Sequence, residues 1–219
     1  DTVNPRVLPP TITNMTIDPD GNYSVSWIEK NPEASPTKFQ LDELINLSLD
    51  EDNAEISHQI WEFEGFSRTT QRAHSGAYSY KSLYGNEKTS GMLTKYPFEL
   101  TENMNLSFWC WYDIEEDWDY AFVEISTEGR SYEVLEGFTG SSGGWIERIY
   151  SLADYVGESV FIRFRYTTDA NTQEEGFYVD DIFPAPEYSS VITLSDDITT
   201  NSYDIIGRPQ GIYYYRARG

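Results

Sequence analysis

The sequence predicts an all-β protein, and three observations lead to that prediction. Pro, Gly, Asn, Asp, Ser and Thr recur at short intervals between runs of β-branched and aromatic residues, a pattern typical of strands joined by turns. Aromatic residues make up 16% of the 219 residues, which is too many for a disordered chain. The one candidate for a long amphipathic helix, residues 37–53, alternates like a strand in its first half.

The N-terminal segment contains three candidate strands. Residues 11–17 alternate in polarity, residues 23–27 form a second run that ends at Trp27, and residues 38–44 form a third. The Asp-Pro-Asp-Gly turn of residues 18–21 separates the first two, because its proline restricts φ and its glycine permits a tight reversal. This order of strands, with Trp27 on the second, resembles the opening of a fibronectin type III domain.

The rest of such a domain follows only at the far end of the chain. Strand candidates lie at residues 189–194, 201–205 and 211–219. The last of these resembles the sixth strand of the same fold, with Tyr213 at the place of its tyrosine-corner residue and with Tyr215 following at period two.

We therefore predict a discontinuous domain that is interrupted by another. Residues 1–48 and 187–219 would form one fibronectin III-like or immunoglobulin-like sandwich whose last strand is missing, and residues 55–186 would form the inserted domain. Such an insertion is tolerated when the ends of the guest domain lie close together. The alternative is a set of unrelated β segments that flank one domain.

The predicted insert carries an ordered series of motifs. It opens with the acidic strand Trp-Glu-Phe-Glu-Gly-Phe at residues 61–66, and a His-Ser-Gly turn then leads into an alternating strand that ends at Tyr80. Three further motifs follow in order: Trp-Asp-Tyr-Ala-Phe at 118–122, Gly-Gly-Trp at 143–145 and Phe-Tyr-Val-Asp-Asp at 177–181. The series resembles the MAM-like jelly roll that accompanies the catalytic domain in secreted metallopeptidases of the immune inhibitor A type. The opening is shared with carbohydrate-binding jelly rolls. The resemblance implies a jelly-roll β-sandwich that is an accessory domain.

Asp180 and Asp181 are a candidate metal site, since adjacent carboxylates are disfavoured in a strand and a buried unpaired charge is costly. The resemblance implies one structural calcium ion held by Asp181 (or Asp180), by Glu64 (or Glu62) and by the backbone around Ser75. The alternative is that Asp180 is solvated and Asp181 accepts hydrogen bonds from neighbouring loops.

A second acidic group lies between two strand candidates. Asp113, Glu115, Asp117 and Asp119 alternate along one loop, as the oxygen ligands of an EF-hand calcium loop do, but the glycine of that motif is absent. Carboxylates so close together repel one another unless they are solvated or bridged by a cation. We expect a solvated loop with occasional cation occupancy.

A possible ligand surface combines aromatic and guanidinium groups. Trp109 and Trp111 share one face of their strand, and Arg163 and Arg165 share one face of theirs. If the two faces coincide, these residues and Glu124 would form a ladder suited to sugar rings or protein side chains. The alternative is a cross-strand ladder that only holds the sheet together, and exposure of the two tryptophans distinguishes these readings.

No catalytic residue is predicted. A zinc peptidase needs His-Glu-x-x-His, but the two histidines, His58 and His74, lie sixteen residues apart. The chain has no Gly-x-Ser-x-Gly elbow, and Gly137 to Gly144 reads as a flexible turn. Carboxylate pairs are so abundant that none stands out as a glycosidase pair.

The formal net charge of −22 limits the partners. Nucleic acid and anionic membranes are disfavoured, because binding to either relies on Lys and Arg and only 15 are present. The single cysteine, Cys110, lies in a strand-like run and is expected to be a small buried hydrophobe. We see no signal peptide and no membrane span, so we expect a monomeric fragment of a larger extracellular or cell-surface protein.

These observations favour a non-catalytic, calcium-stabilised accessory or adhesion region of a secreted or surface metallopeptidase or a related surface protein. It would engage an extracellular protein, a glycan or the adjacent catalytic domain of the same chain. A stand-alone carbohydrate-binding module is the main alternative, and a jelly-roll glycosidase or lyase is a third. Fold alone cannot choose among them.

Overall fold

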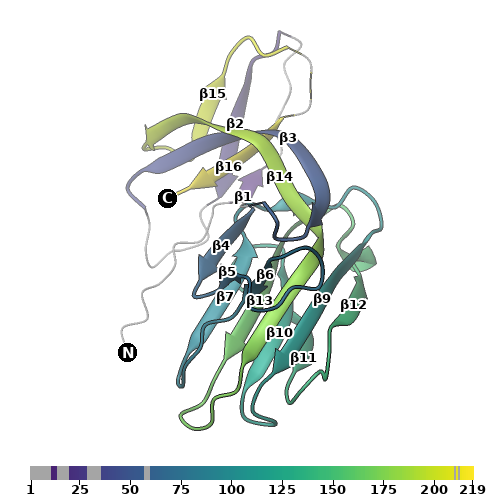
Figure 1. Cartoon of the computed structure of the whole chain (residues 1–219). Helices are drawn as coiled ribbons and strands as arrows, with labels where there is room; N and C mark the ends of the chain where they lie inside the picture. Colours follow the sequence, from purple (N-terminus) through teal and green to yellow (C-terminus); the bar gives the residue numbers. More distant parts are fainter. Residues whose placement is uncertain (1–10, 14–19, 29–35, 57–59, 210, 212) are drawn as a thin grey trace. The chain divides into compact units, whose positions relative to one another are not determined.

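The structure is a computed structural model that describes residues 11–13, 20–28, 36–56, 60–209, 211 and 213–219. The described residues form strands β1 to β16 and one short 3-10 helix, η1 (Ala153–Tyr155), with no α-helix among them (Figure 1). The predicted all-β fold is confirmed. No helix in the described part of the chain is long and apolar enough to cross a membrane.

Contacts divide the chain into two compact units. Unit one comprises Asp1–Leu47, Glu128–Arg130 and Tyr188–Gly219, and unit two comprises Ser48–Thr127 and Ser131–Glu187. The chain leaves unit one within strand β3 (Phe39–Asp52) and, apart from the short segment Glu128–Arg130, returns within strand β14 (Gly176–Ile198).

Unit one has two groups of paired strands. A three-stranded sheet has the order β1 (Thr11–Thr13), β2 (Tyr23–Ile28), β15 (Ser202–Ile205). In the second group, β3 lies between β14 and β16 (Tyr214–Arg218). The core is the set of buried residues Val25, Trp27, Phe39, Leu41, Ile198, Ile205 and Ala217.

Aromatic side chains make two long-range or turn contacts in unit one. The rings of Trp27 and Phe39 meet edge to face at 5.5 Å, so they join strands β2 and β3 across the core. Tyr213 donates its hydroxyl to the carbonyl oxygen of Pro209 at 2.9 Å, the kind of backbone contact that a tyrosine corner makes. The assignment of unit one as fibronectin III-like stays a prediction.

Unit two contains two antiparallel sheets (Figure 1). The first sheet has the order β11 (Glu133–Phe138), β10 (Tyr120–Ser126), β13 (Ser159–Thr167), β7 (Thr89–Thr94), β4 (Trp61–Glu64), and β8 (Phe98–Glu99) also pairs with β13. The second contains β12 (Ile146–Ser151), β9 (Asn105–Asp113), β14, β6 (Ser79–Lys81) and β5 (Ser67–Thr69). The chain passes back and forth between the sheets, as in the predicted jelly roll.

The core of unit two lies between these sheets. On β9 and on β13 every second side chain is buried, which gives each strand one inward face. Phe108 on β9 meets Phe164 on β13 edge to face at 4.9 Å, so the inward faces of the two sheets pack together. Cys110 is fully buried on the same inward face, and burial raises the pKa of its thiol to about 12, so the thiol is unreactive at neutral pH.

Candidate functional site

Two neighbouring carboxylates on β14 hold the His-Ser-Gly turn. The Oδ2 atom of Asp180 accepts the backbone N–H groups of His74 at 2.7 Å and of Ser75 at 3.2 Å. Asp181 accepts the hydroxyl of Ser75 at 2.5 Å and lies 2.5 Å from Nδ1 of His74. The structure thus brings together three of the predicted calcium ligands, Ser75, Asp180 and Asp181, but through direct hydrogen bonds.

A break in the strand allows both carboxylates to reach the turn. The pairing of β14 with β9 shifts register between Asp180 and Phe183, and Asp181 has a positive φ of 49°. Asp180 is fully buried, and this burial raises the pKa of its carboxyl to about 6 although backbone N–H groups favour its charged form.

The other two predicted ligands do not join this group. Glu62 and Glu64 are exposed on β4, which belongs to the first sheet, whereas Asp180 and Asp181 lie on the second. In the described part of the chain, these four carboxylates contribute to no group of three or more that could hold a metal ion. The family resemblance implied that these motifs meet, but β4 and β14 belong to different sheets.

The group that does come together is drawn from the second acidic segment. Glu115, Asp119 and Asp169 each offer an oxygen atom within 4.8 Å of the others, and no second such group occurs among the residues that the structure describes. Asp119 is fully buried and accepts the N–H of Asp169 at 2.9 Å. The prediction included Glu115 and Asp119 but missed Asp169.

Asp113 and Asp117 lie outside this group. Asp113 ends strand β9 and pairs with Gly176, while Asp117 is exposed in the turn with a φ of 66°. The N–H of Asp117 donates to Thr139 at 2.8 Å, which ties the turn to the loop after β11. Only two of the four alternating carboxylates, Glu115 and Asp119, therefore lie together, because a tight turn does not keep alternate residues on one side.

The predicted ladder of Trp, Arg and Glu residues is divided between the two sheets. Trp109 and Trp111 lie on β9 of the second sheet, whereas Glu124 lies on β10 and Arg163 and Arg165 lie on β13 of the first. The two faces therefore do not coincide, and the combined surface is not formed.

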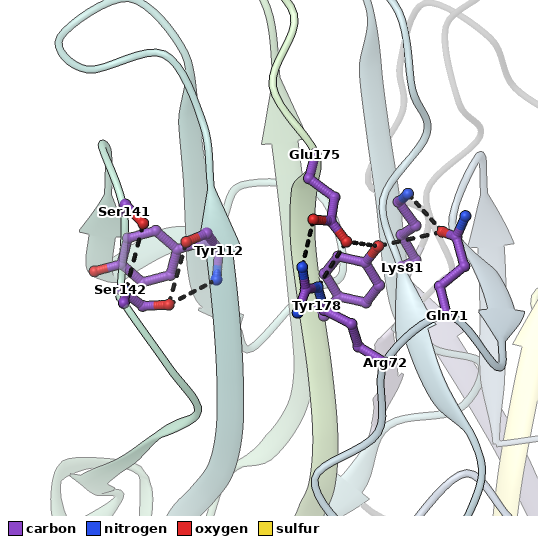
Figure 2. Close-up of polar contacts among 9 residues, drawn as sticks. Gln71, Arg72, Lys81, Tyr112, Ser141, Ser142, Glu175 and Tyr178 are labelled. Atoms are coloured by element: carbon purple, nitrogen blue, oxygen red, sulfur yellow. Dashed lines mark hydrogen bonds and ion pairs between the residues drawn. The ribbon is translucent and has the colours of Figure 1, made fainter.

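The tryptophan half of that surface is covered by the segment before β6. The imidazole of His74 stacks on Trp109 at 3.7 Å, and the guanidinium of Arg72 lies 3.7 Å from the ring centre of Trp111. Arg72 forms two 2.6 Å bonds with Glu175, as Figure 2 shows. Because cationic or imidazole groups already cover the ring faces, neither tryptophan offers an open platform for a sugar.

A polar network continues beside this cover. Tyr178 donates its hydroxyl to Glu175 at 2.8 Å, and Lys81 donates to Gln71 at 2.7 Å (Figure 2). On the other side of β9, the N–H of Ser142 donates to the Tyr112 carbonyl at 2.9 Å, so the glycine-rich loop is fastened to the strand (Figure 2). These contacts fix loops on the sheet and present no nucleophile next to a base.

The arginine half is a structural ion-pair ladder. Glu124 is buried, with Arg163 at 2.6 Å and Arg165 at 2.8 Å. The guanidinium of Arg163 lies 3.8 Å from the ring centre of Tyr132, and that of Arg165 lies 4.2 Å from Phe122. The three strands β10, β11 and β13 are neighbours, so this is the cross-strand packing that the sequence left open as the alternative.

Sequence reasoning missed several residues that organise unit two. Asp52 accepts hydrogen bonds from Trp61 and Tyr80, and Glu175 anchors Arg72. Their partners are distant along the chain, so no local pattern marks them. His58 lies outside the described residues.

The chain is similar to domains of known peptidases. The family described as "Immune inhibitor A-like, MAM domain" matches residues 62–207. Pre-pro-metalloprotease PrtV of Vibrio cholerae is 29% identical over 118 residues, which are 49% of this chain and 13% of that protein. Bacillopeptidase F of Bacillus subtilis is 28% identical over 128 residues, which are 56% of this chain and 9% of that protein.

The matched segment is a small part of each of these relatives. Among solved structures, the K2 cleaved adhesin domain of Lys-gingipain aligns with a TM-score of 0.45 and 17% identity, covering 64% of this chain and 97% of that one.

Proposed function

This chain belongs to the immune inhibitor A-like MAM domain family, and we propose that it is a non-catalytic accessory region of a secreted or cell-surface peptidase. The observation that carries the proposal is the family match over residues 62–207, which includes most of unit two. The peptidase relatives support it, because the similar segment occupies only 13% and 9% of their lengths.

The partner in this proposal is a protein, either the catalytic domain of the same chain or an extracellular protein. The covered rings of Trp109 and Trp111 favour a protein over a glycan, since sugar stacking needs an open aromatic face. The net charge of −22 favours a partner surface with basic groups, which it would attract over a long range at low salt.

Calcium binding is the second part of the proposal. An ion that binds only the folded state stabilises it by mass action, by about 2.7 kcal/mol at a concentration one hundred times its Kd. We expect unfolding in millimolar calcium to occur several degrees higher than in EDTA. Equal midpoints in the two conditions would remove calcium from the proposed function.

The accessory role is tested in the parent peptidase. One form would carry the whole chain, and a second would have residues 48–187 replaced by a short linker. We expect the two forms to cleave a short peptide at the same rate per active site. The deleted form should cleave a large protein substrate more slowly or should be secreted in lower yield. Hydrolysis of peptide or glycoside by the isolated chain would contradict the non-catalytic assignment, and binding to a glycan array would favour the carbohydrate-binding alternative.

A further inference from the structure

Two large aromatic side chains lie exposed on loops of unit two. Tyr84, in the loop between β6 and β7, is 62% exposed, and Trp118, in the turn between β9 and β10, is 65% exposed. Among the described residues, Phe63 on β4 is the other exposed Phe, Tyr or Trp side chain. Rings this exposed gain little from burial when the domain folds, so the stability of unit two does not account for them.

Hydrogen bonds join these two loops to the loop between β13 and β14. The N–H of Glu87 donates to the carbonyl oxygen of Asp169 at 2.6 Å. The N–H of Asp169 in turn donates to the carboxylate of Asp119, the residue after Trp118, at 2.9 Å. The three loops therefore form one connected surface, called here the loop platform, which consists of residues 82–88, 114–119 and 168–175.

The turn that carries Trp118 is fixed by its own hydrogen bonds. The N–H of Asp117 donates to the hydroxyl of Thr139 at 2.8 Å, and the N–H of Asp119 donates to the carbonyl oxygen of Glu115 at 3.1 Å. A fixed turn loses little conformational entropy when a partner binds to it. Exposed tryptophans on such supports are typical anchors of protein interfaces.

The loop platform is strongly acidic. Its one basic residue is Lys88, whereas its carboxylates at exposed positions are Glu87, Glu116, Asp117 and Glu174. At physiological salt these charges act on a partner within a Debye length of about 8 Å. Charge complementarity therefore selects a partner segment that carries Arg or Lys.

The same unit already holds a guanidinium group between a tryptophan ring and a carboxylate. Arg72 lies 3.7 Å from the ring centre of Trp111 and forms two hydrogen bonds with Glu175. Trp118 directly follows the exposed carboxylate of Asp117. Of the residues that the structure describes, however, no Lys or Arg lies over the Trp118 ring. The turn thus offers an aromatic face and negative charge without a cation from the chain itself.

We propose that the loop platform docks an arginine-bearing segment of the protein partner, with a guanidinium group stacked on the ring of Trp118. This inference rests on the proposed function and names the surface that binds its partner and the chemistry of that partner. Arginine is favoured over lysine, because its planar group stacks on an aromatic face and binds a carboxylate through two donors at once. A neutral sugar gains no charge attraction from the platform, so the acidity favours a cation over a glycan. Tyr84 supplies a second exposed ring on the same platform.

The proposal is tested with fluorescently labelled nona-arginine and nona-lysine peptides, whose anisotropy is followed as the intact chain is added at low salt. We expect the wild type to bind nona-arginine more tightly than nona-lysine. Trp118→Ala should weaken nona-arginine binding by about 3- to 30-fold and reduce the preference for arginine, because it removes the ring but no charge. Ile149→Ala, which removes a 57% exposed apolar side chain from β12, is the matched control and should bind both peptides like the wild type.

A second pair of variants tests the position of the charge. Asp117→Asn and Glu147→Gln each remove one negative charge from an exposed position, the first on the loop platform and the second on β12. Asparagine also tolerates the positive φ of residue 117, so the turn is kept. We expect Asp117→Asn to weaken nona-arginine binding more than Glu147→Gln does. Equal effects would mean that the peptide responds only to net charge, which contradicts docking at the platform.

The outcomes separate this inference from the broader proposal. Thermal unfolding of all four variants establishes that they fold. A wild type without a preference for arginine, or a Trp118→Ala variant that keeps the full preference, overturns the inference and leaves the accessory role standing. Binding to a glycan array that is lost in Trp118→Ala, with unchanged peptide binding, also overturns it. The accessory role is contradicted independently if deletion of residues 48–187 leaves the parent peptidase unaffected.

Discussion

A single buried carboxylate, Asp52, holds together three parts of unit two. It accepts the indole N–H of Trp61 at 2.6 Å, the hydroxyl of Tyr80 at 2.8 Å and the N–H of Ala54 at 2.9 Å. Trp61 lies on the first sheet and Tyr80 on the second, so this side chain links the two sheets through their aromatic residues. Burial, reinforced by the charge of Asp52, raises the pKa of Tyr80, which keeps that hydroxyl a donor at all physiological pH values.

Removing this acceptor should be among the most damaging single changes in the chain. Asp52→Ala leaves three donors without a partner in a buried site, and we expect a loss of about 3–5 kcal/mol in the free energy of unfolding of unit two. Urea unfolding followed by tryptophan fluorescence measures it. Asp50→Ala, at an exposed position two residues earlier, should change stability by less than about 0.5 kcal/mol. Similar losses in both variants would show that Asp52 has no special role.

Glu175 has a pH-dependent contribution to stability. Its hydrogen bonds with Arg72, helped by Tyr178, lower the pKa of its carboxyl in the folded state. A depressed folded-state pKa means that the stabilisation is present above the unfolded value and is lost as the pH falls through the folded value. The pair is partly exposed, so screening by solvent limits its contribution to about 1 kcal/mol.

The expected result is a variant whose defect depends on pH. Glu175→Gln should be less stable than the wild type at pH 7, and this difference should shrink as the solution is acidified through the lowered pKa of Glu175, where the wild-type carboxyl also gains a proton. Guanidinium unfolding of both proteins at several pH values gives the difference directly. A gap that stays constant with pH would mean that the charge of Glu175 does not contribute.

At the scale of strands and loops, residue patterns predicted which face of a strand is buried better than they predicted which strands are neighbours in a sheet. Alternation identified the inward faces of β9 and β13, since polarity within one strand reports its own burial. It could not tell that these strands belong to different sheets, and so it wrongly joined Trp109 to Arg163. Which sheet a strand joins depends on where the chain crosses from one sheet to the other, and such crossings leave no local pattern in the sequence.

The proximity of Glu115, Asp119 and Asp169 was partly predictable for the same reason. Glu115 and Asp119 are four residues apart, so their proximity is a property of one turn and could be inferred. Asp169 reaches them only because the loops after β9 and after β13 converge in the folded unit. The motif that carried Asp180 and Asp181 located a real contact with the His-Ser-Gly turn, but residue order alone could not show that Glu62 and Glu64 lie on the other sheet.

The segment before β6 acts as a cover for the outer side of β9, and its removal has a measurable effect. Replacing Arg72 and His74 together with Ala uncovers Trp111 and Trp109, so we expect stronger acrylamide quenching of tryptophan fluorescence and a stability loss of about 1–3 kcal/mol. Lys88→Ala, an exposed change on another loop, should alter neither quantity by more than its error. Unchanged quenching in the double variant would indicate that the two side chains do not shield the indole rings.

At the scale of the whole molecule, the two units have a simple covalent relation. Apart from the short segment Glu128–Arg130, which is grouped with unit one, the chain passes between them within continuous strands, β3 and β14. Within unit one the two strands are adjacent, and the hydroxyl of Ser189 donates to the carbonyl oxygen of Ile45 at 3.1 Å. The positions that flank unit two are therefore close in space, which is the geometric condition for inserting or removing a domain.

We expect each unit to fold without the other. A chain in which residues 48–187 are replaced by a linker of about four residues should keep the fold of unit one, since hairpin connections of this length join adjacent antiparallel strands. Residues 48–187 alone should unfold cooperatively, because they contain both of the faces that pack together through Phe108 and Phe164. Calorimetry of the intact chain should show two transitions, one of which matches the transition of isolated unit two. One merged transition in the intact chain, with both fragments unfolded, would mean that the units form one cooperative structure instead.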